Sequence, residues 1–200
     1  MSAPIDFYFD FTSPYGYLMS EKIDALAARF GRAVNWHPIL LGIVFKETGG
    51  QPPISSSLKG PYLLRDVPRS ARFLQLAYQH PATFPVATQA AGRSFYWLQD
   101  RDPQLARHFA HAIYRAYFVD GRDIGKPEVV IEIAAALGVS ADELNSALAL
   151  PEVKEHLQKA SLDAMQRGVF GSPYVLIDDE PFFGADRLPQ IERWLQTGGF

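Results

Sequence analysis

The chain has 200 residues, a formal net charge of −3, 48% hydrophobic residues and no cysteine. This charge gives no attraction to a nucleic-acid backbone, and no apolar stretch approaches the roughly 20 residues needed to cross a bilayer. The lack of cysteine excludes disulfide exchange, a cysteine nucleophile and a thiolate metal site. We therefore expect a globular protein that binds neither nucleic acid nor membrane. Because an apolar run starts about four residues after Met1, we expect no signal peptide and a cytoplasmic location.

The first predicted element is a strand, because apolar residues alternate from Ile5 to Phe11. Ser13 and Pro14 follow, and helical periodicity starts after Pro14, which makes Ser13 the expected N-cap. A helix start directs free backbone N–H groups and the positive end of the helix dipole towards any anion bound there. Ser-Pro is also an ordinary helix start, so this dipeptide alone does not require a function.

The middle of the chain is predicted to be helical. After a strand that carries Trp36, a loop rich in Gly, Pro and Ser runs from Thr48 to Gly60. The helical patterns then cover Tyr62 to Tyr78, Thr88 to Leu98, Pro103 to Phe118, Pro127 to Leu137, Ser140 to Leu148 and Glu152 to Arg167. Ser140 and Glu143 have the spacing of a capping box. We expect an inserted helical domain at residues 49–166, between the two parts of a discontinuous domain at residues 1–48 and 167–200.

The C-terminal part returns to strands. A short apolar strand, Tyr174 to Ile177, follows Pro173, which implies an edge position or a cis bond. A turn and a second strand come next, and Gly184 to Arg187 opens a last helix. Strand, helix, strand at the front and strand, strand, helix at the back is the thioredoxin-like order. The expected fold is α/β: a thioredoxin-like fold with a large all-helical insertion, and a ligand in the cleft between the two parts.

Five strings carry a family resemblance: FDFTSPYGY, WHPILLGIVF, KGPYLLRDVPR, GVFGSP and FFGADRL. In this order, over nearly the whole chain, they resemble the 2-hydroxychromene-2-carboxylate isomerases. That family is similar to kappa-class glutathione transferases and, more distantly, to DsbA-type oxidoreductases. The resemblance implies glutathione as cofactor, a homodimer, and isomerisation of a small aromatic carboxylate in aromatic catabolism.

Ser13 is the implied catalytic residue, as donor to the glutathione sulfur. Lowering a thiol pKa from about 8.5 to about 6.5 requires roughly 2.7 kcal/mol. A hydroxyl hydrogen bond to an anion supplies about 1.5–3 kcal/mol and a helix N-terminus about 0.3–1 kcal/mol. The two together are sufficient, so the serine itself does not need to ionise.

The remaining implied glutathione contacts are the backbone of Ser172, the last-helix start and two helical-insertion residues. With Ser13, the full set is Lys59, Asp66, Ser172, Gly184, Ala185, Asp186 and Arg187. Each charged member has a plainer alternative: Asp186 as a helix cap, Asp66 as an i,i+3 partner of Arg69, and Lys59 as solvated surface.

Lys46 is the expected cation for the substrate carboxylate or for a developing enolate. The expected aromatic walls of the substrate site are Phe45, Tyr96 and Trp97. A surface lysine and ordinary core aromatics are the alternatives. No metal is expected, because His108 and His111 share a helix face without a third ligand. Asp10 either polarises the site or is satisfied by backbone N–H groups.

Two other functions stay open. A kappa-type glutathione transferase would share the activated thiolate but release an adduct, and a glutathione-binding module would lack catalysis. Many family members have Thr-Gly-Asn where this chain has Thr48-Gly49-Gly50, and that asparagine is an expected substrate contact. The substrate is therefore less firmly implied than the cofactor.

Overall fold

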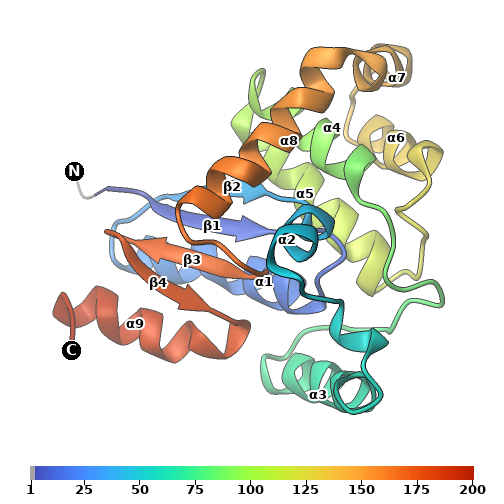
Figure 1. The fold of residues 1–200 in the computed structure, drawn as a ribbon. Helices are drawn as coiled ribbons and strands as arrows, with labels where there is room; N and C mark the ends of the chain where they lie inside the picture. Colours follow the sequence, from blue (N-terminus) through green and yellow to red (C-terminus); the bar gives the residue numbers. More distant parts are fainter. Residues whose placement is uncertain (1–2) are drawn as a thin grey trace.

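The computed structural model describes residues 3–200 and is built on a four-stranded sheet in the order β2-β1-β3-β4 (Figure 1). The strands are β1 (Ile5–Phe9), β2 (Val34–Pro38), β3 (Tyr174–Ile177) and β4 (Glu180–Phe183). β1 pairs parallel with β2 and antiparallel with β3, and β3 pairs antiparallel with β4. The segments before residue 49 and after residue 166 thus form one sheet, as the sequence predicts. The Ser172–Pro173 bond is cis, and β3 lies inside the sheet.

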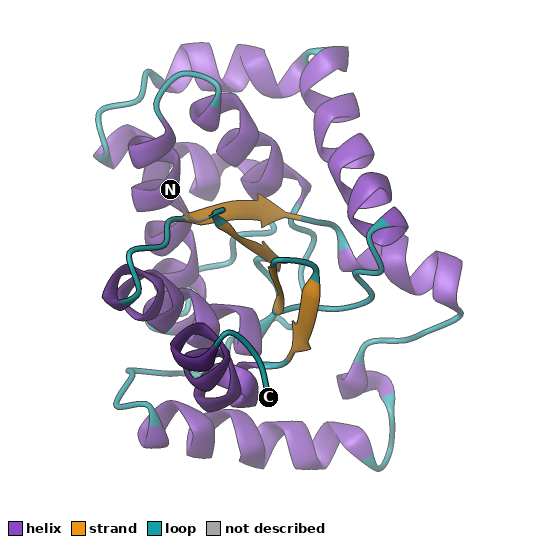
Figure 2. Cartoon of the chain, turned by 90° about the vertical axis from the view of Figure 1, so that its left-hand side faces the viewer, coloured by secondary structure: helices purple, strands orange, loops and turns teal. Residues whose placement is uncertain are grey.

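Helices surround this sheet on both sides (Figure 2). They are α1 (Pro14–Arg29), α2 (Leu41–Thr48), α3 (Lys59–Phe73), α4 (Gln89–Gln99), α5 (Pro103–Phe118), α6 (Pro127–Ala136), α7 (Ala141–Ala149), α8 (Pro151–Gln166) and α9 (Leu188–Thr197), with 3-10 turns η1 (Pro53–Ser55) and η2 (Ala185–Arg187). α3 lies apart from the group of α4 to α8 and packs beside α1 (Figure 1). Within the described residues no helix is both long and apolar enough to span a membrane.

The alternating pattern of β1 accounts for the two hydrophobic clusters. Ile5, Phe7 and Phe9 are fully buried on one face of the sheet, in a large cluster with residues of α1, α4, α5 and α9. Tyr8 lies on the other face, in a smaller cluster with residues of β3, α2 and the end of α8. Both faces of the sheet are therefore covered.

The large cluster extends across the predicted domain boundaries. The ring of Phe9 lies 5.9 Å from that of Phe95 in α4 and 5.8 Å from that of Tyr114 in α5. Such spacings are those of favourable aromatic pairs. The described helices of residues 49–166 thus share their core with the sheet, and the division into two domains stays a prediction.

Helix bounds agree with the sequence prediction except at α2, which was not predicted, and at α3. The helices α4 to α8 begin and end within one residue of the predicted positions, and Ser140 caps α7 by accepting from the N–H of Glu143 at 3.3 Å. The predicted helix from Tyr62 to Tyr78 is present with other bounds, because α3 begins at Lys59 and ends at Phe73. Its chain reverses through Gln75 at φ +57°, a conformation that usually needs glycine. The sequence therefore carries no stop signal there.

A polar cluster joins the C-terminal end of α8 to the sheet. The carboxylate of Asp6 accepts from Asn35 at 3.1 Å, from Nε2 of His37 at 2.9 Å and from Arg167 at 2.9 Å. Burial works to raise the pKa of Asp6, but the hydrogen bonds from His37, Arg167 and Asn35 and the charge of His37 outweigh it. The pKa therefore lies well below the ordinary value of 3.8.

We expect this cluster to make stability depend on pH. A lowered folded pKa contributes stability that is present above the unfolded pKa and is lost as the pH falls. Between pH 5 and pH 3 the free energy of unfolding should fall by about 1 kcal/mol more in the wild type than in Asp6→Asn, a modest value because the cluster is partly exposed. Urea unfolding at both pH values measures the difference, and equal losses in the two proteins would contradict the assignment.

Candidate active site

Ser13 lies at the N-terminus of α1 in the predicted N-cap position. Its backbone is extended (φ −86°, ψ 114°), and its Oγ accepts from the N–H of Gly16 at 3.0 Å. Pro14 occupies the first helical position, where its missing N–H costs nothing. Ser13 is only 5% exposed, so its hydroxyl is held inside the protein. The predicted N-cap is confirmed.

The structure brings Ser13 and Ser172 together, although they are far apart in the chain. The hydroxyl of Ser13 donates to the backbone carbonyl oxygen of Ser172 at 3.0 Å. The backbone N–H of Asp10 donates to Oγ of Ser172 at 2.9 Å. The turn after β1 and the segment before β3 are thereby joined at the start of α1.

Asp10 is the buried carboxylate of this region. It accepts from the N–H of Thr12 at 3.0 Å, from the N–H of Leu41 at 2.7 Å and from the hydroxyl of Thr88 at 2.7 Å. Burial raises its pKa, and these three hydrogen bonds oppose that effect without cancelling it. Of the two alternatives for Asp10, satisfaction by backbone N–H groups is the one observed.

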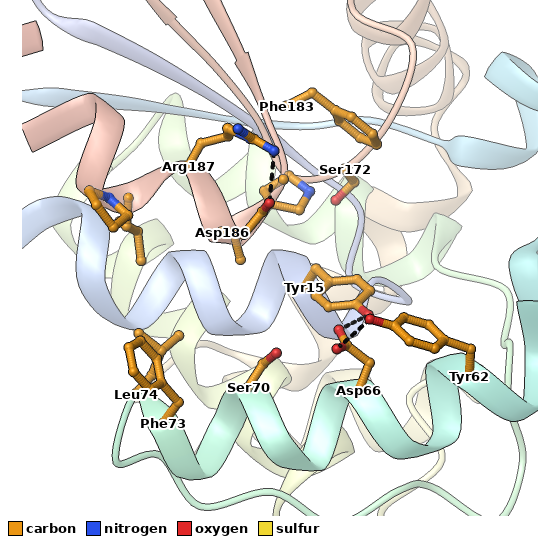
Figure 3. Close-up of a pocket in the computed structure, with 15 residues that line it drawn as sticks. Tyr15, Tyr62, Asp66, Ser70, Phe73, Leu74, Ser172, Phe183, Asp186 and Arg187 are labelled. Atoms are coloured by element: carbon orange, nitrogen blue, oxygen red, sulfur yellow. Dashed lines mark hydrogen bonds and ion pairs between the residues drawn. The ribbon is translucent and has the colours of Figure 1, made fainter.

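A cavity of about 660 Å³ opens beside Ser172, between α1, α3 and the β4–α9 segment (Figure 3). This volume is in the range of small-molecule sites. Its walls are polar at Ser172, at the start of α9 and at Asp66 and Ser70 of α3, and are aromatic or aliphatic elsewhere. The lining residues are Tyr15, Tyr62, Asp66, Ser70, Phe73, Leu74, Ser172, Pro173, Phe183, Gly184, Ala185, Asp186, Arg187, Leu188 and Pro189.

Asp66 lies on the α3 side of this cavity and accepts from three donors. The hydroxyl of Tyr15 donates to it at 2.6 Å, the hydroxyl of Tyr62 donates at 3.1 Å, and the guanidinium of Arg69 forms an ion pair with it. Burial works to raise the pKa of Asp66, but the hydrogen bonds from Tyr15, Arg69 and Tyr62 hold it below its ordinary value. The predicted i,i+3 pair with Arg69 is present, and so is a position in the cavity wall.

The opposite wall comes from the turn that opens α9. Gly184 has φ +105° and its N–H donates to the carbonyl oxygen of Pro173 at 3.1 Å, which ties this turn to the segment before β3. A side chain at this glycine would collide with the carboxylate of Asp186. Arg187 donates to Asp186 at 2.9 Å. The wall therefore presents a carboxylate and a guanidinium side by side (Figure 3).

The structure does not bring every predicted site residue to this cavity. Ser13 lies behind its wall and reaches it through Ser172. Lys59 and Lys46 are exposed at the start of α3 and on α2, and Phe45 is half-buried; none of the three lines the cavity.

The two aromatic residues predicted in α4 are packed in the interior. Tyr96 is 4% exposed and donates to the carbonyl oxygen of Pro38 at 3.0 Å, and Trp97 is 9% exposed and lies under the guanidinium of Arg101. Neither lines the cavity, so their packing favours the alternative of core residues.

Sequence reasoning missed the aromatic residues that do line the cavity. Phe73 and Phe183 are 83% and 47% exposed on opposite sides of it, and Tyr15 and Tyr62 reach Asp66. Three of them stand inside the resemblance strings, in which they were not assigned a role. Phe73 carries no sequence signal beyond its place in the helical pattern. Among residues 3–200 no cluster of ligating side chains is arranged to hold a metal ion.

Comparison with known proteins places the chain in a family. Residues 4–196 match the DSBA-like thioredoxin domain. A 2-hydroxychromene-2-carboxylate isomerase of Sphingobium xenophagum is 32% identical over 98% of this chain and 99% of its own length. Glutathione S-transferase kappa 1 of Caenorhabditis elegans is 27% identical over 96% of this chain and 90% of its own.

A solved structure supports the same assignment. A 2-hydroxychromene-2-carboxylate isomerase structure superimposes with a TM-score of 0.86 at 25% identity, covering 96% of this chain and 94% of the other. The thioredoxin-like fold expected from the order of elements is thereby confirmed. The chain therefore belongs to the family of DsbA-like thioredoxin domains.

Proposed function

We propose that the protein is a glutathione-dependent isomerase that interconverts 2-hydroxychromene-2-carboxylate and trans-o-hydroxybenzylidenepyruvate. The observation that carries the proposal is the hydrogen bond from the Ser13 hydroxyl to the backbone carbonyl oxygen of Ser172. It lies at the N-terminus of α1, beside a cavity of about 660 Å³. A serine at this position can donate a hydrogen bond to the glutathione sulfur. It carries no thiol that would compete with glutathione as the nucleophile. The similarity to proteins named as isomerases and kappa-class transferases supports the choice of cofactor.

Glutathione needs partners for two carboxylates, one ammonium group and a peptide backbone. The cavity offers the carboxylates of Asp66 and Asp186, the guanidinium of Arg187 and the backbone of Ser172. We assign the γ-glutamyl group to the turn at Asp186 and Arg187, and the cysteinyl backbone to Ser172, as the resemblance implies. Lys59 lies near one end of α3 and is assigned only to the outer part of the cofactor.

Binding by this arrangement involves an exchange of hydrogen bonds. The carbonyl oxygen of Ser172 accepts from the hydroxyl of Ser13 in the structure, at 3.0 Å. When the cysteinyl N–H of glutathione takes over that carbonyl, the Ser13 hydroxyl is free to turn to the sulfur, while its Oγ keeps the bond from Gly16. A hydrogen bond to a charged acceptor is stronger than one to a carbonyl, so the exchange favours the thiolate.

The thiolate then performs the reaction. A C–S bond forms at an unsaturated carbon of the substrate, the ring C–O bond breaks, and the carbon–carbon bond that was locked becomes free to rotate. Breaking the C–S bond returns the thiolate and gives the trans open-chain acid, so glutathione is regenerated. Lys46 is assigned to the substrate carboxylate or the developing enolate, with Phe45 beside it in α2.

The direct test is to incubate the purified protein with the substrate and glutathione, and to follow the substrate by absorbance and free thiol by titration. We expect the substrate to convert to its equilibrium mixture while the thiol concentration stays constant. Loss of thiol in step with the substrate would support the transferase instead, and no conversion with intact glutathione binding would support a non-catalytic binding module.

The transferase is retained as a second candidate for one reason. The chain has Gly50 where many isomerases have the substrate-contacting asparagine, directly after Gly49, the left-handed residue that ends α2, at φ +69°. An asparagine side chain is therefore absent from this part of α2 and its end. Substrate recognition would have to come from other groups.

A further inference from the structure

Tyr15 is an unassigned polar residue in the cavity, two positions after Ser13. Its hydroxyl donates to Oδ2 of Asp66 at 2.6 Å, and its ring lies in the cavity wall between α1 and α3 (Figure 3). Burial and the neighbouring carboxylate of Asp66 raise its pKa above the ordinary value of 10.0. The phenol is therefore protonated at working pH and acts as a donor.

The other two donors to Asp66 come from its own helix. Tyr62 and Arg69 lie on α3, both reach Oδ1, and both are mostly exposed. Tyr15 thus makes the one described bond to Asp66 that crosses from α1 to α3. Without it, Asp66 would be restrained only by flexible, solvated side chains of the same helix.

A carboxylate offers about four acceptor positions, two on each oxygen. Oδ1 of Asp66 already accepts from Tyr62 and Arg69, and Oδ2 accepts from Tyr15. One position is left, and it is on the oxygen whose direction Tyr15 sets. A nitrogen donor of a ligand would bind there.

We propose that Tyr15 is a positioning residue that holds Asp66 at a fixed place relative to Ser13, so that glutathione binds with its sulfur at Ser13. The connection is short and stiff: Ser13 is the N-cap of α1, and Tyr15 follows Pro14 in the first turn of that helix. This inference rests on the proposed function, because it takes glutathione as the ligand.

The test compares three tyrosine-to-phenylalanine variants by calorimetric titration with glutathione. In Tyr15→Phe the affinity should fall about tenfold, since a hydrogen bond to a charged group is lost. Tyr62→Phe should lose less, because water can replace its exposed hydroxyl. Tyr17→Phe is the matched control: its hydroxyl, on the same helix, donates at 2.7 Å to the carbonyl oxygen of Ala77, away from the cavity. It should bind as the wild type does.

A second readout separates positioning from general loosening of the fold. The hydrogen bond from Tyr15 helps to hold the pKa of Asp66 low, so in Tyr15→Phe that pKa should rise. The loss of glutathione affinity on acidification should then begin at a higher pH than in the wild type or Tyr17→Phe. The pKa of the bound glutathione thiol should rise as well, because the sulfur is no longer held against the Ser13 hydroxyl.

The outcomes are distinguishable. If the wild type does not bind glutathione, the proposed function fails and this inference falls with it. If the wild type binds but Tyr15→Phe matches Tyr17→Phe both in affinity and in the pH at which acidification lowers that affinity, the inference alone is overturned. If the affinity of Tyr15→Phe falls but its loss on acidification begins at the same pH as in the wild type, Tyr15 acts through packing and the positioning role is likewise overturned.

Discussion

Replacing Ser13 by alanine is expected to raise the pKa of protein-bound glutathione by about one to two pH units, because the hydroxyl bond to the thiolate contributes about 1.5–3 kcal/mol. At pH 7, with a wild-type pKa of about 6.5, the loss of thiolate should lower kcat/KM by roughly threefold to twenty-five-fold. Ultraviolet absorbance of the thiolate between pH 5 and pH 9 measures the first effect, and initial rates measure the second. The affinity for glutathione should change less, since the proposed contacts at Asp66 and Asp186 remain.

The same substitution also removes a helix cap, so it needs a control for stability. Ser13 accepts from Gly16 at 3.0 Å, and its loss should destabilise α1 by about 1 kcal/mol. Ser140→Ala removes an equivalent cap from α7, where Oγ accepts from Glu143 at 3.3 Å far from the cavity. It should cost similar stability and leave the thiolate unaffected. An unchanged thiolate pKa in Ser13→Ala would mean that Ser13 does not stabilise the thiolate, and it would contradict the assigned role.

Much of the fold was predictable because local signals agree with the packing. β1 alternates between two buried faces, and Ser13-Pro14 begins α1 with a side-chain cap and a ring suited to the first turn. Pro103 and Ser140 mark α5 and α7 in the same way. Such signals lie within a few residues of one another, so no tertiary contact is needed to read them.

The parts that the sequence missed depend on contacts between distant residues. α2 (Leu41–Thr48) has no side-chain cap from its own N-cap residue; its first N–H group, that of Leu41, donates to Asp10, 31 residues earlier. The aromatic lining of the cavity was not predicted, because burial depends on which face of a helix meets the sheet. Tyr96 points into the core, whereas Phe73 is exposed to the cavity at the end of α3. No local pattern distinguishes these two cases.

Removing the Asp10 carboxylate is expected to lower the free energy of unfolding more than the loss of the Ser13 or Ser140 cap does. Asp10 is 2% exposed, and its three donors belong to separate segments: the turn before Ser13, the start of α2 and the start of α4. Asp10→Ala leaves three buried or partly buried donors without an acceptor. Each unsatisfied group costs about 1–3 kcal/mol, so the free energy of unfolding should fall by at least about 3 kcal/mol.

The matched control is Asp102→Ala. Asp102 also accepts from two backbone N–H groups, of Gln104 at 2.9 Å and Leu105 at 3.1 Å, but at the exposed start of α5. Water can replace its carboxylate, and the loss should be only about 1 kcal/mol. Urea unfolding of both variants gives the comparison. A loss in Asp10→Ala no larger than in Asp102→Ala would mean that the three segments are held by their apolar packing, and that the Asp10 bonds contribute little.

Asp10→Asn separates the segments from one another. The amide oxygen is best placed at Oδ1, where it keeps the bonds from Thr12 and Thr88, and its NH₂ group then faces the N–H of Leu41. Two donors cannot bond, so the start of α2 alone is released.

Backbone amides of α2 should exchange with solvent at least tenfold faster in Asp10→Asn than in the wild type, while those of the first turn of α1 are unchanged. Because α2 carries Lys46 and Phe45, which the proposed function assigns to the substrate, activity should fall through weaker substrate binding while the thiolate pKa stays unchanged. Equal acceleration in α1 and α2 would show that Asp10 holds the whole region as one unit.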